Sequence, residues 1–490
     1  LRGTSRLTLS VNRTMRQTLR RSCAACAKSK HSCDLRTPRC SRCIKRKVLC
    51  VYANEPLTAA PAGSGPAPGD GATSPAALDG SGALTNYRFG SFDPFDSYPQ
   101  TRLPREQVQR LIHSFLHKIA FEYYPLDLSA TSNPFLVSWW PLALGDPALF
   151  HVSLQTACLD EELLAQRGFQ SSEILMADSV ALLRRKVEDT SLAIQDGTMN
   201  SVITLAAIEF GKGNTQVSDM HVDGVKKLVN MRGGINSVRQ TSPLTARMVS
   251  WVSMIVTGQP QFETQDDTGI GDGVPPPPEW QLDSTTFHET LSELSSVEID
   301  YAVRNVLMRL RNIFQRAQRV PLAPTRLHDL TCFVIHRLLL STPNGMDPHA
   351  SVSECIRYGI ILYMFIVQGP TYYSHAVIFN TILKRFMDHL KQLQLQSRSK
   401  SHIGSSLDVW LLTVGMAASN GSGHYDWLIR RARDVAVATQ LTSWDDTLVH
   451  NQSLLWLETR HSDDVFRPHW DAIFGRLSHT PFRYSLSPVV

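Results

Sequence analysis

The sequence predicts an all-α protein in which a small cysteine-rich head precedes a large helical body. Six of its nine cysteines fall between residues 23 and 50. From about residue 105 onward, apolar residues recur at helical spacing, and no series of alternating strands is visible. Between these parts, Ala, Pro, Gly and Ser fill 21 of the 30 positions from 57 to 86. Such a segment cannot form a core, so we expect a disordered linker there.

These shifts in composition divide the 490 residues into five segments. We expect a disordered tail over 1–14, the head over 15–56, the linker over 57–86, the helical body over 87–475 and a second tail over 476–490. As a flexible coil, the linker would have a mean reach of roughly 30 Å. Head and body are therefore expected to tumble semi-independently.

The charge of the chain is concentrated in the head. Residues 1–55 hold 14 Lys and Arg against two acidic residues, a net charge of +12, whereas residues 56–490 hold 35 basic and 42 acidic residues, a net charge of −7. A basic head implies a polyanionic partner, either nucleic acid or an anionic membrane surface. The head has no amphipathic apolar face to bury in a membrane, and the apolar stretch 358–367 is about half the length of a membrane span. We therefore expect nucleic acid and no membrane partner.

The head cysteines repeat one half-site, C-x2-C-x6-C, twice. No secretion signal is readable in residues 1–22, so we expect a reducing compartment, where clustered thiols are metal ligands rather than disulfides. Iron–sulfur ligation is a weaker alternative, because the thiols do not follow ferredoxin spacing. The six candidate ligands are Cys23, Cys26, Cys33, Cys40, Cys43 and Cys50.

Six thiolates can hold two zinc ions only by sharing. Structural zinc takes four ligands, so two ions need eight ligand positions, and two sulfurs must each serve both metals. The repeat symmetry points to Cys23 and Cys40 as the bridging pair. The expected cofactor is two Zn²⁺ per chain. Because so short a segment buries little apolar surface, zinc would supply its folding free energy, roughly 10–16 kcal/mol in small finger peptides.

This spacing resembles the fungal binuclear zinc cluster of the Zn2Cys6 transcription factors. The resemblance implies that each C-x2-C begins a short helix and that the first helix enters the DNA major groove. It also implies CGG-type triplets as the half-site. By position, Ser29 and Lys30 are the base-facing pair. We expect Lys30 to read bases, since lysine can donate to guanine O6 and N7.

The other basic residues of the head are expected to follow the DNA backbone. With six thiolates and two zinc ions included, the head keeps a charge of about +10. Ala27 and Ser32 stand where the family commonly has basic residues, and residues just upstream of the cluster are candidates to compensate. The expected further contacts are Lys28, Arg36, Arg39, Arg42, Lys45, Arg46 and Lys47, with Arg20 and Arg21 upstream.

Helical periodicity runs through most of the body. Asp146 and Pro147 are typical of an N-cap and first turn, and Gly233 and Gly234 of a helix end. The remaining cysteines, Cys158, Cys332 and Cys355, are expected as small core residues. We expect helices near 105–121, 147–159, 172–188, 199–211, 216–232, 244–257, 296–319, 326–341, 352–368, 374–394, 406–418, 424–439 and 444–458.

The body resembles the fungal-specific transcription factor regulatory domain. The segments that carry this resemblance are "NPFLVSWWPLALGDPALFHVSLQTA" (133–157), "HVDGVKKLVNMRGGI" (221–235), "ECIRYGIILYMFI" (354–366) and "WLLTVGMAA" (410–418). In that family the region is a helical body linked to effector response and protein contacts, with no established catalytic role. The resemblance covers about 87–475.

Together these features predict a nuclear, zinc-dependent, sequence-specific regulator of RNA polymerase II genes rather than an enzyme. Its expected partners are double-stranded DNA and the transcription machinery or co-regulators. No heptad pattern occurs between Val51 and Asn86, so the sequence leaves a homodimer open. Control of secondary-metabolite gene clusters is common in the family, although no residue here selects it. The rival hypothesis is a helical ligand-binding protein or enzyme whose zinc head only docks a partner.

Overall fold

The chain forms two compact units, Leu1–Tyr87 and Arg88–Val490. Within the part of the chain that is described, every regular element is a helix, and the extended pairing is one isolated bridge between Thr264 and Val274. The predicted all-α class is therefore confirmed. The computed structural model describes residues 24–31, 41–48, 98–123, 129–166, 168–282, 299–341, 350–397 and 405–475.

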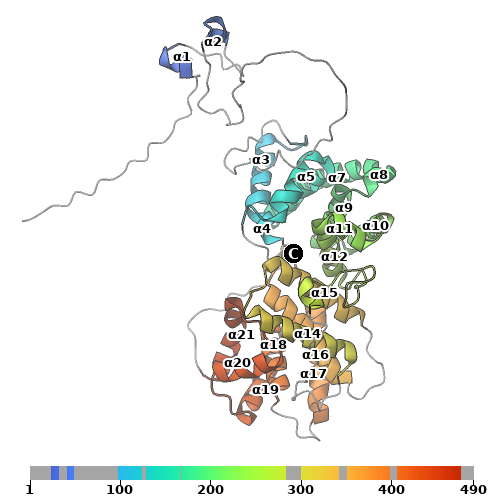
Figure 1. Cartoon of the computed structure of the whole chain (residues 1–490), viewed down its shortest axis with the longest axis vertical. Coiled ribbons are helices and arrows are strands. Elements are labelled where there is room, and N and C mark those ends of the chain that lie inside the picture. The colour runs from blue at the N-terminus through green and yellow to red at the C-terminus, as the bar shows by residue number, and fades with distance from the viewer. Residues whose placement is uncertain are drawn as a thin grey trace, which may run out of the picture. The chain divides into compact units, whose positions relative to one another are not determined.

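The first unit contains two short helices of equal length (Figure 1). Helix α1 spans Ala24–Lys28 and α2 spans Ser41–Lys45. Each helix begins directly after the first cysteine of a C-x2-C pair, and the second cysteine of the pair is its third residue.

The first half of the body is a set of helices in which α9 packs against helices that precede and follow it. Helix α6 packs against α7 and α9, and α9 in turn packs against α10 and α12 (Figure 1). The elements are α3 (Arg105–Ser114), the π-helical turn η1 (Phe115–Ile119), α4 (Ala120–Glu122), the π-helical turn η2 (Phe135–Trp139), α5 (Trp140–Gly145), α6 (Pro147–Leu164), α7 (Gln170–Glu188), α8 (Thr190–Ala193), α9 (Asp196–Gly211), α10 (Thr215–Met231), α11 (Ile235–Thr241) and α12 (Pro243–Thr257).

The N-terminus of α6 is a junction between three helices. The Asp146 carboxylate accepts hydrogen bonds from the backbone of Ala148 at 3.1 Å and Leu149 at 3.4 Å, so the predicted N-cap is confirmed. The same carboxylate pairs with Lys186 on α7. It also lies against Gly197 on α9, where an added Cβ would fall 1.9 Å from an Asp146 oxygen. A residue larger than glycine at 197 would therefore push these helices apart.

The second half of the body is built around one central helix. Helix α16 is buried over nearly its whole length and packs against α14, α15, α17 and α18. Among the described residues, no helix is both long and apolar enough to cross a membrane. The elements are α13 (Pro278–Gln281), α14 (Tyr301–Ala317), α15 (Pro324–Leu340), α16 (Ala350–Gln368), α17 (Ala376–Ser397), α18 (Ser406–Ala418), α19 (Tyr425–Ala438), α20 (Trp444–Leu454) and α21 (Arg460–Ile473).

One carboxylate fastens the non-helical segment between α12 and α13 to the second half. Asp267 accepts hydrogen bonds from four side chains on α13, α14 and α15: Trp280 Nε1 at 3.1 Å, Asn305 Nδ2 at 3.3 Å, Arg309 Nη2 at 3.3 Å and Arg337 Nη2 at 3.2 Å. The Arg309 side chain is only 6% exposed. Because a buried cation needs a compensating charge, the Asp267 carboxylate stabilises the buried Arg309 guanidinium at this position.

Most of the predicted helices are present, but several bounds differ, and the short elements η2, α5, α8, α11 and α13 were not expected. The helix expected from residue 296 begins at Tyr301, where Asp300 caps it. The helix expected over 444–458 ends at Leu454. Helix α21 was not anticipated, because Pro468 within it is a residue that normally interrupts helices.

Candidate nucleic-acid interface

The two halves of the head repeat in backbone geometry as well as in sequence. The carbonyl of Cys26 accepts a hydrogen bond from the backbone of His31 at 3.0 Å, and that of Cys43 accepts one from Val48 at 3.1 Å. The residue before each donor, Lys30 or Lys47, has a positive φ, of 51° and 52° respectively. Both helices therefore end in the same left-handed turn, in which the backbone folds back over the second cysteine.

Lysine is unusual at this position of a helix end. A left-handed conformation is disfavoured by about 1–2 kcal/mol for residues that carry a Cβ, which is why glycine is common there. Lys30 and Lys47 both adopt it, 17 residues apart. Each turn directs the backbone toward the second cysteine of the C-x2-C pair that precedes it. Because the local backbone preference of lysine opposes this turn, other interactions must stabilise the turn.

The buried side chains in the described part of the head are sulfur. Cys26 is 1% exposed and Cys43 is 2% exposed, while every other described side chain placed in α1, α2 and their turns is half-buried or exposed. Neither cysteine belongs to the apolar core of the protein. An interior formed by these thiols fits a metal centre, because zinc accepts thiolate ligands in closed structural sites.

The basic side chains of the head point outward. The segments 24–31 and 41–48 contain no Asp or Glu, so their cations have no carboxylate within these segments to pair with. Exposed and uncompensated cations are what phosphate contacts require. The exposed predicted contact residues are Lys28, Lys30, Arg42, Lys45, Arg46 and Lys47.

Ser29 is placed differently from the other predicted contacts. It is half-buried, and its hydroxyl donates a hydrogen bond to the Ala25 carbonyl at 2.8 Å. Its oxygen also accepts a hydrogen bond from Arg46 Nη1 at 3.4 Å, which links the second half of the head to the first. The sequence does not predict this contact, since the cysteine spacing does not say how two short helices face each other.

Eight of the predicted residues lie outside the described residues. For these positions the sequence prediction stands as made. They are the cysteines Cys23, Cys33, Cys40 and Cys50 and the arginines Arg20, Arg21, Arg36 and Arg39.

The cysteines of the body differ from those of the head. Cys158, Cys332 and Cys355 are buried among apolar residues of α6, α15 and α16, which confirms them as core residues. Burial raises the pKa of the Cys158 thiol to about 12 and also raises the pKa of Cys332 and Cys355. These thiols are therefore neutral near pH 7 and unsuited to bind zinc. The described residues hold no group of three or more His, Cys, Asp or Glu that could bind a metal.

Comparison with protein families agrees with this geometry. A family model described as the fungal Zn(2)-Cys(6) binuclear cluster domain matches residues 21–59, and one described as a fungal specific transcription factor domain matches residues 110–265. The chain therefore carries the domain pair of the fungal zinc-cluster transcription factors. It is a zinc-binding, DNA-binding transcription regulator. Neither curated proteins nor solved structures gave a match to the chain.

The two matched regions correspond to the two parts of the zinc-cluster regulator described above. The first contains α1 and α2, and the second extends from α3 into the non-helical segment after α12. Helices α13 to α21 follow the second matched region.

Proposed function

We propose that this zinc-cluster regulator acts in the nucleus on RNA polymerase II genes and reads CGG-type triplets in double-stranded DNA. The observation that carries the proposal is the paired half-site, in which Cys26 and Cys43 are turned inward and the cations are turned outward. A positive surface on a sulfur-lined interior suits a duplex, because exposed cations can contact its phosphates. The DNA-binding domain would span 15–56, the linker 57–86 and the regulatory body 87–475.

Two zinc ions per chain would hold this surface together. One ion would be bound by Cys23, Cys26, Cys33 and Cys40, and the other by Cys40, Cys43, Cys50 and Cys23. Zinc supplies structural cross-links when bound. The chain's own residues then orient α1 and α2, and the contact from Arg46 to Ser29 helps to fix the two helices relative to each other.

Lys30 is the proposed base-reading residue, and the other cations are proposed to contact phosphates. Lys30 is exposed at the C-terminal turn of α1, whereas the Ser29 hydroxyl is already engaged by the Ala25 carbonyl. Discrimination between triplets is therefore expected to depend on Lys30 more than on Ser29. A single good base contact contributes about 1–3 kcal/mol of discrimination.

Fluorescence anisotropy with two duplexes, one containing CGG triplets and one with the same composition but no triplet, tests this assignment. Lys30→Ala should reduce the preference for the CGG duplex by about 5- to 100-fold. Lys45→Ala, an exposed cation on α2, serves as the matched control and should weaken binding to both duplexes about equally. Equal losses on both duplexes for Lys30→Ala would remove Lys30 from the base-reading role.

Genome-wide occupancy mapping would identify the genes that the protein controls and would test whether secondary-metabolite gene clusters are among them. The same experiment reports whether occupied sites contain one triplet or two. Paired triplets at fixed spacing would support a homodimer on DNA, since half-site spacing mirrors the geometry of a dimer.

A further inference from the structure

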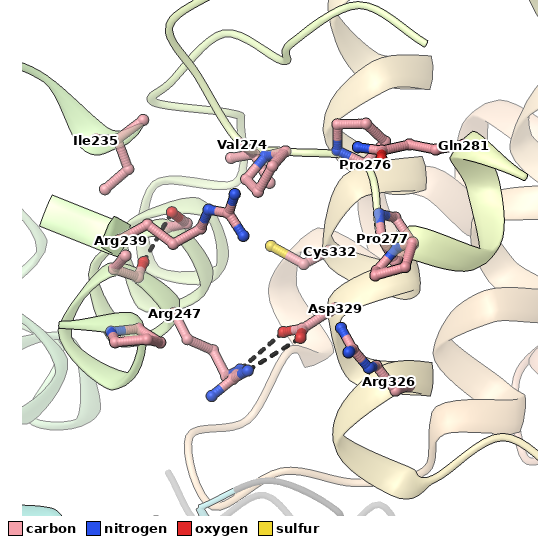
Figure 2. Close-up of a pocket in the computed structure, with 15 residues that line it drawn as sticks. Ile235, Arg239, Arg247, Val274, Pro276, Pro277, Gln281, Arg326, Asp329 and Cys332 are labelled. Carbon is pink, nitrogen blue, oxygen red and sulfur yellow. Dashed lines mark hydrogen bonds and ion pairs between the residues drawn. The ribbon is translucent and has the colours of Figure 1, made fainter. Parts of the chain in front are cut away.

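The body contains a cavity of about 450 Å³. It lies between α11, α12, α13 and α15, and the chain from Val274 to Pro278 forms one wall (Figure 2). Small-molecule sites are typically clefts of ~300–1,000 Å³, so the cavity is large enough for a ligand of a few rings. Some of the residues that line the cavity lie in the region matched by the transcription factor domain model. Others lie after that region, on α15 among other elements.

The floor of the cavity is apolar and rigid. Val274, Pro276 and Pro277 are buried, and the four consecutive prolines 275–278 present ring faces with no backbone N–H to solvate. Ile235 and Ala246 are buried on the opposite side. Cys332 adds a thiol whose pKa is raised by burial, so it is a neutral part of the wall. A flat apolar ring is the group that such walls accommodate best.

Three arginines line the cavity, and two of them have acidic partners. Arg247 donates from Nε and Nη2 to Asp329 at 2.7 Å and 2.9 Å. Arg326 lies 3.9 Å from Glu279. Arg239, by contrast, has no hydrogen-bond or ion-pair partner among the described residues, and Figure 2 shows its guanidinium reaching toward Cys332. The cavity thus has one uncompensated positive charge at an exposed rim position.

We propose that this cavity binds an organic monoanion, a carboxylate on an apolar ring body, with the carboxylate on Arg239 and the ring against the prolines. The guanidinium fork of arginine matches the two oxygens of a carboxylate. A phosphate ester would bring a second negative charge, and the other two arginines are already engaged by Asp329 and Glu279. The site is independent of the head, so the proposal does not rest on DNA recognition.

Isothermal titration of the full-length chain with three aromatic monocarboxylates, benzoate, 1-naphthoate and indole-3-acetate, tests the proposal. At least one should bind saturably, and its neutral amide should bind at least about tenfold more weakly. No saturable binding by any of the three overturns the proposal. Equal affinity for acid and amide, or tighter binding of 1-naphthyl phosphate than of 1-naphthoate, overturns the assignment to a monoanion.

Variants locate the binding site. Arg239→Gln keeps a polar side chain at an exposed position and should weaken the best acid about 10- to 100-fold while leaving its amide unchanged. Arg319→Gln, at an exposed arginine outside the cavity, is the matched control and should leave both affinities unchanged. Ala246→Leu, which fills space on the side opposite the prolines, should weaken acid and amide alike. Full affinity in Arg239→Gln would contradict the proposed role of its guanidinium.

Discussion

The head and the body of this chain place opposite kinds of side chain in their interiors. In the described head the buried side chains are Cys26 and Cys43, and the cations are exposed on segments 24–31 and 41–48, which contain no Asp or Glu. In the body the interior is aliphatic and aromatic, and its buried cations, such as Arg309, have carboxylate partners. The comparison teaches that burial of apolar side chains can stabilise the fold of the body. The head, in contrast, needs bound metal to stabilise a fold that has thiolates inside and cations outside.

Metal removal gives the largest expected contrast between the two parts. Adding a zinc chelator under reducing conditions should reduce affinity for the CGG duplex by more than about 100-fold, because the head loses its source of folding free energy. The far-UV circular dichroism of the chain should keep most of its helical signal, since the body contains nearly all the described helix. Anisotropy and circular dichroism on one sample check both statements. Unchanged DNA binding after complete zinc removal would undermine the contrast.

A matched pair of cysteine substitutions distinguishes the role of the buried thiols in the head from their role in the core of the body. Cys26→Ser removes a proposed zinc ligand and should abolish specific DNA binding while leaving the thermal unfolding of the body unchanged. Cys158→Ser places a hydroxyl in the apolar core and should destabilise the body by about 1–3 kcal/mol without loss of zinc. Zinc content and denaturant unfolding measure both effects. A body destabilised by Cys26→Ser would show that the two parts depend on each other.

Substitution of Asp267 tests the pairing of cations in the body. Asp267→Asn removes the carboxylate that pairs with Arg309 and Arg337, and the body should lose about 2–3 kcal/mol of stability against urea. Asp219→Asn, at an exposed position on α10, is the control and should change stability by less than about 0.5 kcal/mol. DNA affinity should be unaffected in both variants. Equal stability of the two variants would mean that the ion pairs of Asp267 do not stabilise the body.

The smallest effect concerns the N-terminus of α20. Hydrogen bonds from Thr442 and Ser443 lower the pKa of the Asp446 carboxyl from 3.8 to about 2. A lowered pKa in the folded state stabilises the fold above the ordinary pKa, and this contribution is lost as the pH falls through about 2. Thermal unfolding should show Asp446→Asn less stable than the parent chain at pH 5, with the difference shrinking toward pH 2. A difference that stays constant over this range would exclude the carboxylate as its cause.

Sequence signals located the helices whose ends are set locally. The start of α6 was predictable because Asp146 and Pro147 act within one turn, and the glycines after α10 have the positive φ values that end a helix. The end of α20 was not predictable. There the Leu455 carbonyl accepts a hydrogen bond from Trp410 at 2.8 Å, and the Leu457 N–H donates to the Tyr363 hydroxyl at 2.7 Å. Partners 45 and 94 residues away replace the helical hydrogen bonds.

The same distinction applies to the sites. The resemblance to the zinc-cluster family implied that each C-x2-C begins a short helix, and α1 and α2 begin there. The contact between Arg46 and Ser29 depends on how two helices face each other. The cavity beside Arg239 depends on segments that come together only in the folded body. Neither feature leaves a local pattern that could be read in advance.

Native mass spectrometry of the reduced, full-length chain tests the central claim most directly. If two metal ions shared by six thiolates form the core of the head, the mass should exceed that of the bare chain by two zinc ions, with the corresponding protons lost. The Cys26→Ser variant should fall below two. A mass showing one zinc, none, or three disulfides in place of metal would contradict the account.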